Sequence, residues 1–220
     1  MSDKLVLTLL GGQMIGILRA SVILIATFTT CTSWSQGYVG GGIGRGNISF
    51  PAVTSIGAAP ASSTSGTNTK GTGKLFAGYQ LTPIWAVEFG YNSLGRGYSN
   101  NLATAAGSAN SAAKITNVYT SFMAGVPVGH GISLLGELGL ARNNSSVDIV
   151  CIGVNCTAPR STYNWSTVAG IGAEYAFTAK YGLRLQYEDF GKASKGDPYG
   201  NGSGGAIKVK AWTVAAKATF

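Results

Sequence analysis

The sequence has no uninterrupted apolar stretch long enough for a membrane-spanning helix. Its two most apolar segments, Leu5–Leu18 and Ala20–Thr30, are divided by Arg19. Each is therefore shorter than the ~18 uninterrupted apolar residues that a spanning helix requires. We therefore do not predict a membrane protein that spans the bilayer with helices.

The same segments have the pattern of an export signal. From an alternative start at Met14, a short region with Arg19 leads into an apolar core and then into Ser33–Ser35, with small residues at the cleavage positions. We predict that residues 1–35 are a signal peptide and that residues 36–220 form the mature domain. Export then places the mature chain outside the cytoplasm.

Charged residues and histidine are also scarce. Only 11% of the residues are charged, and His130 is the single histidine. Hydrolases of membranes usually combine histidine with serine or aspartate, and the sequence contains no G-x-S-x-G motif and no metal-ligand cluster. We therefore expect a protein that is not an enzyme and that holds no metal or cofactor.

Cysteine is rare, with three residues in the chain. Cys151 and Cys156 remain after removal of the signal peptide and form a C-x4-C pair. In an oxidising compartment such a pair is most simply a small disulfide. A zinc site would need about four ligands, and no histidine or second cysteine pair is near.

Acidic residues are fewer than basic ones. Removal of Asp3, Lys4 and Arg19 with the signal peptide reduces the 16 basic and eight acidic residues to 14 and seven, a net charge of +7. A basic excess suits nucleic acid, an anionic surface or plain solubility. Because export separates the chain from nucleic acid, we predict no nucleic-acid partner.

Glycine, by contrast, is abundant. The chain has 33 glycines, and its mean hydropathy is +0.20 although it has no long apolar run. A composition so rich in glycine and poor in charge argues against helical bundles. It is typical of membrane β-barrels, in which the apolar signal is spread over segments of about ten alternating residues.

The clearest alternation lies in the segment Lys74–Arg96. Leu75, Ala77 and Tyr79 occupy every second position and would lie on one face of a strand. After a break at Thr82–Ile84 the alternation resumes. On the second limb one face is apolar and aromatic, and the other is small or polar. This pattern predicts a β-hairpin. The residues on the two faces of the second limb are Trp85, Val87, Phe89 and Tyr91 against Ala86, Glu88, Gly90 and Asn92.

Similar alternation predicts eight strands in the mature chain. The candidates are Gln36–Asn47, the two limbs of Lys74–Asn92, Lys114–Val126, Gly131–Arg142, Tyr163–Ala176, Lys180–Phe190 and Ala206–Phe220.

The connections alternate in length. Tight turns are predicted at Thr82–Ile84, Pro127–His130 and Phe177–Ala179, and long linkers near 48–72, 94–113, 143–162 and 191–205. Short turns at one end and long loops at the other are typical of outer-membrane barrels. We therefore predict an all-β, eight-stranded, antiparallel up-and-down transmembrane barrel with short periplasmic turns and four long extracellular loops. A soluble secreted ligand-binding barrel is the weaker alternative.

Three segments resemble the N-terminal transmembrane domain of outer membrane protein A. They are FAGYQLTPIWAVEFGYNSLGRG, AGIGAEYAFTAKYGLRLQYEDFG and the final strand that ends in Phe220. The resemblance covers essentially the whole mature chain, and it is strongest in the second, third, sixth and seventh strands. It implies an outer-membrane barrel of a Gram-negative bacterium. We expect a small, barrel-only member without the peptidoglycan-binding domain.

In that family, charged side chains in the lumen form salt bridges that fill or gate a narrow interior. By this resemblance Glu88, Glu174 and Arg184 occupy matching motif positions. Glu137 lies on the inner face where the family more often has a basic residue, and Met123 replaces an interior lysine. The predicted lumen charge network is Glu88, Glu137, Glu174 and Arg184, with Lys74 and Lys217 as additional partners.

Basic residues gather on the predicted extracellular side. Lys208 and Lys210 share parity with the outward Trp212, and Arg45 lies at a strand end. We expect these three cations to contact lipopolysaccharide phosphates, although a merely solvated rim has the same pattern.

Two functions are compatible with this sequence. The first is a structural and surface-exposed role, in which the barrel stabilises the envelope and its loops meet host surface molecules or phage. The second is a minor porin that passes small solutes, for which an eight-stranded lumen leaves little room. We expect a monomer, and the low-complexity loops identify no ligand.

Overall fold

The computed structural model describes seven parts of the chain, which are residues 36–50, 55–56, 59–60, 66–104, 107–152, 160–194 and 206–220. The signal peptide predicted at residues 1–35 lies outside them. The predicted disulfide between Cys151 and Cys156 also falls outside, because Cys156 is not among the described residues. Within these parts, no helix is long and apolar enough to cross a membrane.

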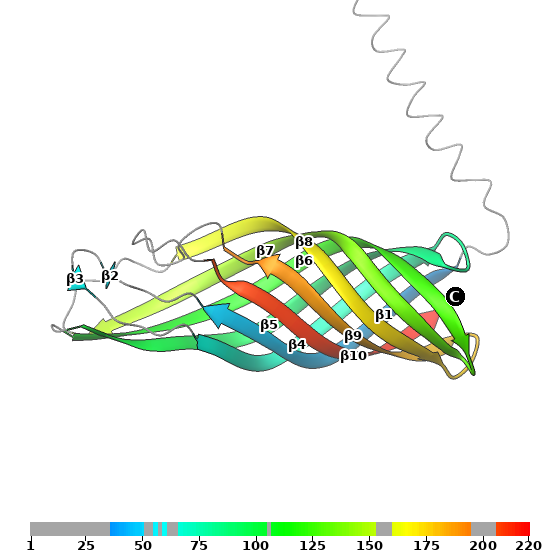
Figure 1. Cartoon of the computed structure of the whole chain (residues 1–220), viewed down its shortest axis with the longest axis horizontal. Coiled ribbons are helices and arrows are strands. Elements are labelled where there is room, and N and C mark those ends of the chain that lie inside the picture. The colour runs from blue at the N-terminus through cyan, green and yellow to red at the C-terminus, as the bar shows by residue number, and fades with distance from the viewer. Residues whose placement is uncertain are drawn as a thin grey trace, which may run out of the picture. The chain divides into compact units, whose positions relative to one another are not determined.

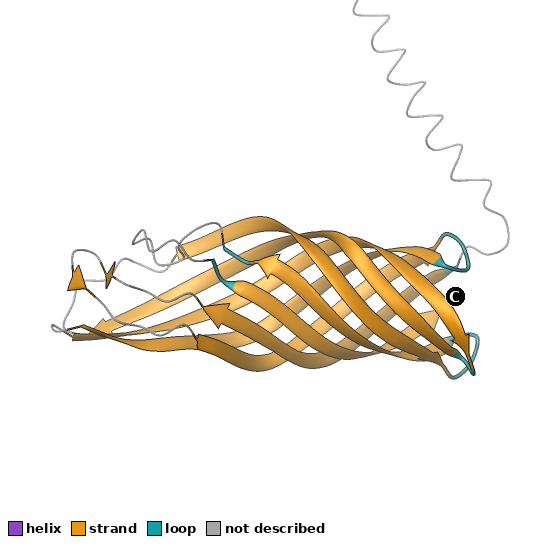
Figure 2. Cartoon of the chain, viewed as in Figure 1, coloured by secondary structure: helices purple, strands orange, loops and turns teal. Residues whose placement is uncertain are grey.

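Eight strands close into one antiparallel barrel (Figures 1 and 2). Around the barrel they follow the order β1-β10-β9-β8-β7-β6-β5-β4, and the short strands β2 and β3 pair only with each other. The predicted all-β, eight-stranded antiparallel barrel is confirmed. The bounds are β1 Gly37–Phe50, β2 Ser55–Ile56, β3 Ala59–Pro60, β4 Gly66–Gln80, β5 Trp85–Thr104, β6 Gly107–Gly129, β7 Ile132–Ile152, β8 Arg160–Ala176, β9 Tyr181–Lys192 and β10 Lys208–Thr219.

Strand β1 closes the barrel between the last strand and β4. Tyr38 pairs with Thr219 of β10 on one side and with Gly78 of β4 on the other. Beyond the strand ends, the Phe220 amide donates a hydrogen bond of 2.9 Å to the Gly37 carbonyl. A closed sheet has no edge, so its amides find partners without water, as hydrocarbon surroundings require.

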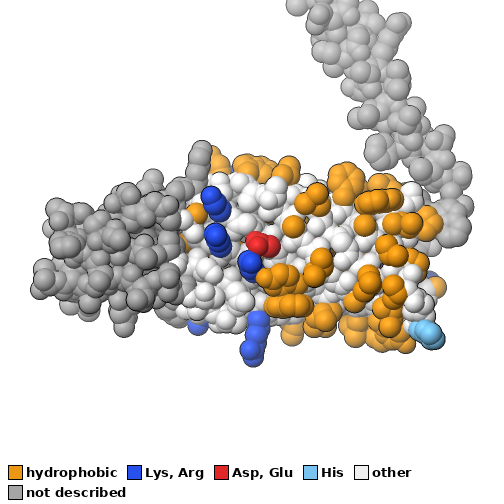
Figure 3. Space-filling view, in the orientation of Figure 1, with side chains coloured by type: hydrophobic (Ala, Val, Ile, Leu, Met, Phe, Trp, Pro, Cys, Tyr) orange, Lys and Arg blue, Asp and Glu red, His pale blue; other side chains and the backbone are white. Residues whose placement is uncertain are grey.

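Side chains alternate strictly between the two faces of the wall. In β9 every second residue from Gly182 to Phe190 is buried, and the residues between them are more exposed. Arg184, Gln186 and Glu188 therefore point inside. The outward set is apolar and covers the barrel over its turn side, whereas Lys and Arg gather farther from the turns (Figure 3). This is the face that meets lipid. Among its members are Val39, Ile43, Leu75, Phe89, Phe122, Leu138, Leu140, Ile171, Leu183 and Val214.

Aromatic rings mark both borders of the apolar face. Near the turns, Tyr175 and Phe177 lie with ring centroids 5.0 Å apart. At the opposite border, Tyr187 and Trp212 lie 4.7 Å apart. Outward-facing rings at two heights are typical of the aromatic girdles that membrane barrels place at the two interfaces.

Two of the three tight turns share one design. Thr82 Oγ1 accepts a hydrogen bond of 3.0 Å from the Trp85 amide, and Thr178 Oγ1 accepts one of 3.0 Å from the Tyr181 amide. The hydroxyl thus replaces a backbone acceptor within the turn. The third turn, between β6 and β7, is built on positive φ at Gly129, His130 and Gly131 instead.

The strands are longer than predicted. Strand β5 continues to Thr104 and β6 begins at Gly107, so the prediction of a long linker at 94–113 was wrong. Strand β7 likewise continues to Ile152, into the linker predicted at 143–162. Beyond the membrane both faces of a strand meet water, and the apolar alternation that reveals a strand is lost.

The interior of the barrel is layered. Two buried apolar clusters occupy it, and polar side chains lie between and among them. The smaller cluster lies toward the turns and consists of Tyr38, Phe76, Ala86, Met123 and Ala215. The larger cluster, called here the apolar plug, consists of Ile48, Phe50, Leu94, Ile115, Tyr119, Ala141, Val168, Phe190, Ala193, Ile207, Val209 and Ala211.

Candidate functional site

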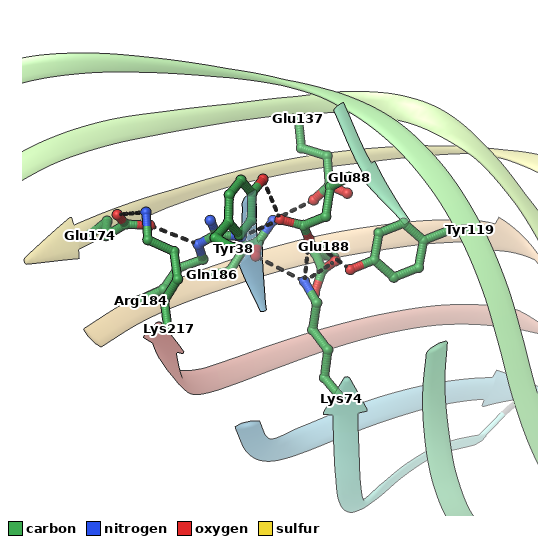
Figure 4. Close-up of polar contacts among 10 residues, drawn as sticks. All are labelled: Tyr38, Lys74, Glu88, Tyr119, Glu137, Glu174, Arg184, Gln186, Glu188 and Lys217. Carbon is green, nitrogen blue, oxygen red and sulfur yellow. Dashed lines mark hydrogen bonds and ion pairs between the residues drawn. The ribbon is translucent and has the colours of Figure 1, made fainter. Parts of the chain in front are cut away.

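A connected set of polar side chains crosses the lumen between the two apolar clusters (Figure 4). It draws members from all eight barrel strands, because inward positions of all strands converge in a barrel this narrow. We call it the interior charge network. Its members are Tyr38, Lys74, Glu88, Tyr119, Glu137, Glu174, Arg184, Gln186, Glu188 and Lys217.

Arg184 joins two carboxylates in this network. Its Nη1 donates to Glu88 Oε2 at 2.5 Å, and its Nε donates to Glu174 Oε2 at 3.1 Å. Lys217 Nζ donates to the other oxygen of Glu174. The guanidinium also lies 4.6 Å from the centroid of the Phe76 ring, a cation–π arrangement. The Arg184 guanidinium thus contacts the carboxylates of Glu88 and Glu174 through its N–H groups and the Phe76 ring through its face.

Lys74 joins the remaining part of the network. Its Nζ lies 2.8 Å from Glu188 Oε1 and donates to Gln186 Oε1 at 2.9 Å. It also lies 3.8 Å from Glu88 Oε1. A continuous series of ion pairs therefore runs from Lys217 through Glu174, Arg184, Glu88 and Lys74 to Glu188.

Glu88 receives the largest number of partners. Besides Arg184 and Lys74, the Tyr38 hydroxyl donates to its Oε2 at 3.1 Å and the Tyr119 hydroxyl donates to its Oε1 at 2.9 Å. The residue is fully buried. A buried carboxylate is tolerated when opposite charge and hydrogen bonds replace its water, and both of these surround Glu88.

Glu137 differs from the other three carboxylates. Its Oε2 accepts a hydrogen bond from Gln186 Nε2, which is neutral. Its Oε1 is buried and has no hydrogen-bond partner within the described residues, and the same is true of Glu188 Oε2. The network thus contains four carboxylates and three cations, and Glu137 contacts none of the cations directly.

The network is open toward the turns and closed toward the other end. Glu174 and Lys217, at its turn side, have side chains 13% and 14% exposed, whereas Lys74, Glu88 and Glu188 have none. A small cavity of about 70 Å³ borders Glu174, Lys217 and Arg184 at that end. On the opposite side the apolar plug covers the network.

Tyr119 links the charge network to the apolar plug. Its hydroxyl bonds Glu88, and its ring lies 5.9 Å from the Phe190 ring within the plug. Ile48, Leu94, Ile115 and Phe190 are completely buried beside it. The extracellular half of the described lumen is thus packed mainly with apolar side chains, among which Asn92, Asn117 and Asn143 are also buried.

The residues predicted for the lumen lie as follows. Glu88, Glu174 and Arg184 lie in direct contact, and Lys74 and Lys217 pair with them. Glu137 points into the same space but contacts Gln186 instead of a cation. Sequence reasoning missed the role of Glu188. Glu188 occupies the same alternate positions of β9 as Arg184 and Gln186, and this spacing already indicated that it faces the lumen.

The cations predicted to contact lipopolysaccharide lie on the outer surface. Arg45, Lys208 and Lys210 are exposed, and Arg45 pairs in register with Trp212. Lys210 Nζ lies 3.3 Å from Asp189 Oδ2. These cations lie toward the aromatic border that is farther from the turns, on the face of β1 and β10 that also carries Trp212.

Across the part of the chain that the structure describes, no three His, Cys, Asp or Glu side chains converge in a way that suits a metal ion. His130 lies exposed in the β6–β7 turn.

Comparison with known proteins gives the same architecture. The family described as Outer membrane protein beta-barrel domain matches residues 18–220. No curated protein matches the sequence.

Solved structures of outer-membrane barrels are similar in fold. Neisserial surface protein A has a TM-score of 0.51 at 14% identity, over 86% of this chain and 100% of that chain. OprG from Pseudomonas aeruginosa has a TM-score of 0.51 at 13% identity, over 84% of this chain and 96% of that chain. Because the family match spans far more than half of its 220 residues, the chain belongs to the outer membrane protein beta-barrel domain family.

Proposed function

We propose that this protein is a sealed outer-membrane barrel with a structural and surface-exposed role and without enzymatic activity. The observation that carries the proposal is the apolar plug. Its residues Ile48, Leu94, Ile115, Val168 and Phe190 are completely buried inside the barrel wall. A lumen that is filled at this height leaves no path for a hydrated solute.

Ion flow through such a layer would be costly. A hydrated ion that enters the plug loses much of its water and meets mainly aliphatic and aromatic groups, with the buried Asn92, Asn117, Asn143 and Ser145 as the polar side chains among them. Hydrophobic constrictions stop conduction even when they are wider than the ion. The charge network beneath the plug then acts as an interior brace, because its ion pairs join strands far apart around the barrel.

The long strands support a role at the cell surface. Strand β6 has 23 residues and β7 has 21, whereas about ten residues cross the membrane. Their shared turn lies at Gly129–Gly131, so the surplus length extends on the side opposite the turns (Figure 1). We propose that this extracellular extension meets host surface molecules or phage.

We also propose that Arg45, Lys208 and Lys210 contact phosphates of lipopolysaccharide. All three side chains are exposed: Arg45 pairs in register with Trp212, and Lys210 and Lys208 lie two and four residues from Trp212 on the same face of β10. A planar guanidinium pairs with phosphate through two donors. We further propose that a signal peptide at residues 1–35 directs export and that residues 36–220 form a monomeric barrel.

Planar-bilayer recording on the refolded barrel tests the sealed lumen. We expect no conductance steps from the wild type or from Arg184→Ala, because the plug remains in both. An open porin in the same bilayer is the positive control. Steady conductance from the wild type that changes in Arg184→Ala would show a pore instead, and the structural role would then be secondary.

A further inference from the structure

The lipid-facing wall is not uniformly convex. A groove of about 710 Å³ lies across β10, β1 and β4 and is bordered by β5 and by the start of β9. We call it the wall groove. Its floor includes Gly41, Ala77, Ala216 and Ala218, and its sides include Tyr181 and Phe89.

The strand register explains this depression. Tyr181 pairs with Ala218, Ala218 with Val39, Val39 with Ala77, and Ala77 with Phe89. Adjacent strands thus place Ala218, Val39 and Ala77, all without a long side chain, between an aromatic ring at each end. Since neighbouring strands lie ~4.8 Å apart, the two rings border a trough that spans several strands.

The groove lies near the turn end of the barrel. Tyr181 follows the β8–β9 turn directly, and Val39 is two residues from the start of β1 at Gly37. The upper side of the groove reaches Gly41 and Tyr91, a few residues farther along the strands. At ~3.3 Å rise per tilted residue these positions fall within about 15 Å of the turns, which is the periplasmic half of the hydrocarbon layer.

A cation lies at the turn end of the groove. Lys180 is exposed in the β8–β9 turn, immediately before Tyr181. Its carbonyl accepts a hydrogen bond of 2.8 Å from the Thr219 amide, so its backbone is fixed beside the end of β10 and next to Ala218. An ammonium at this height is level with the headgroups of the periplasmic leaflet, where it can pair with a phosphate.

We propose that the wall groove binds one acyl chain of a glycerophospholipid from the periplasmic leaflet, with its phosphate paired to Lys180. The apolar floor and aromatic sides suit a methylene chain, which is narrow and flexible enough to follow a depression. The charge at the mouth suits the phosphodiester of the same molecule. A second copy of this barrel fits less well, because two hollow surfaces facing each other leave the depression unfilled.

Native mass spectrometry of the barrel released from nanodiscs of phosphatidylethanolamine tests this site. We expect the wild type to retain one phospholipid per monomer. Ala77→Phe and Ala218→Phe each place a ring on the groove floor and should remove the retained lipid. Lys180→Gln should weaken retention by roughly fivefold, as for the loss of one exposed ion pair.

Ala173→Phe is the matched control, since Ala173 also faces outward on β8 but lies outside the groove. It should retain lipid as the wild type does. Heat-modifiable gel migration shows whether each variant is folded, and Lys180→Gln tests the site even if a ring substitution prevents folding. Equal retention by the wild type and all variants would overturn the proposal. So would a wild-type dimer that Ala77→Phe dissociates, or preferential retention of lipopolysaccharide when both lipids are supplied. None of these outcomes depends on whether the lumen conducts.

Discussion

Arg184 of β9 and Glu88 of β5 meet across the lumen, with Nη1 and Oε2 2.5 Å apart, although 96 residues separate them in sequence. Both side chains are almost entirely buried. Their contact ties opposite sides of the barrel together at the centre of the interior charge network.

Removal of Arg184 should destabilise the barrel strongly. Arg184→Ala leaves Glu88 and Glu174 without their shared guanidinium, and breaking a buried pair by removing one partner costs about 3–5 kcal/mol. Urea unfolding in lipid vesicles measures the free energy of unfolding. The double variant Arg184→Met with Glu88→Met should recover much of the loss, and a double variant as unstable as Arg184→Ala would contradict this account.

Tyr119→Phe isolates one hydrogen bond. The substitution removes the hydroxyl that donates to Glu88 at 2.9 Å and keeps the ring contact with Phe190. Loss of a donor to a charged, buried acceptor should lower the free energy of unfolding by about 1.5–3 kcal/mol. Tyr163→Phe is a suitable control because Tyr163 is exposed, and we expect little change there.

The plug should respond to loss of volume. Phe190→Ala removes a fully buried ring from its contact with Tyr119 and should cost about 3–5 kcal/mol. Phe89→Ala, which removes an exposed ring from the lipid face, is the comparison and should cost less. Similar losses for both would mean that the plug is not a packed layer.

Depth in the membrane should set the cost of a charge on the outer face. Leu138 is 65% exposed and lies six residues from the start of β7, near the middle of the apolar band, whereas Val128 adjoins the turn. Leu138→Arg should lower the free energy of unfolding by about 2–4 kcal/mol and Val128→Arg by about 0–1 kcal/mol. Equal costs would contradict the assignment of this face to lipid.

The β6–β7 turn should depend on glycine at one position. Gly131 has φ +76, and an added Cβ would lie 2.9 Å from the Ala176 carbonyl oxygen. Gly131→Ala should therefore destabilise the barrel by more than ~1 kcal/mol. His130→Gly relieves a positive φ of 53 and should be neutral or slightly stabilising in the same unfolding assay.

Much of this architecture could be predicted from alternation alone. Because successive strand residues face opposite sides, the parity of Trp85 and Phe89 fixes Glu88 inside once their face meets lipid. The tight turn at Phe177–Ala179 also fixes the register of β8 and β9, so that Glu174 pairs directly with Arg184. Local pattern and turn length thus determine contacts between neighbouring strands.

Contacts across the lumen could not be predicted in this way. Lys74 and Glu188 are 114 residues apart, and their pairing depends on how the barrel closes and how its strands are staggered. The extended parts of β5 and β6 were missed for a different reason. Outside the membrane neither face of those strands is confined to lipid, so the sequence there has no period to detect.

The hydrogen bond from Phe220 to Gly37 has a consequence for the order of assembly. Strand β1 acquires its partner on one side only when β10, more than 150 residues later, has arrived. Until then both edge strands of the incomplete sheet carry unpaired backbone amides, which are energetically costly in hydrocarbon. Insertion and closure should consequently be one slow, concerted event, since contacts so distant in the chain delay folding.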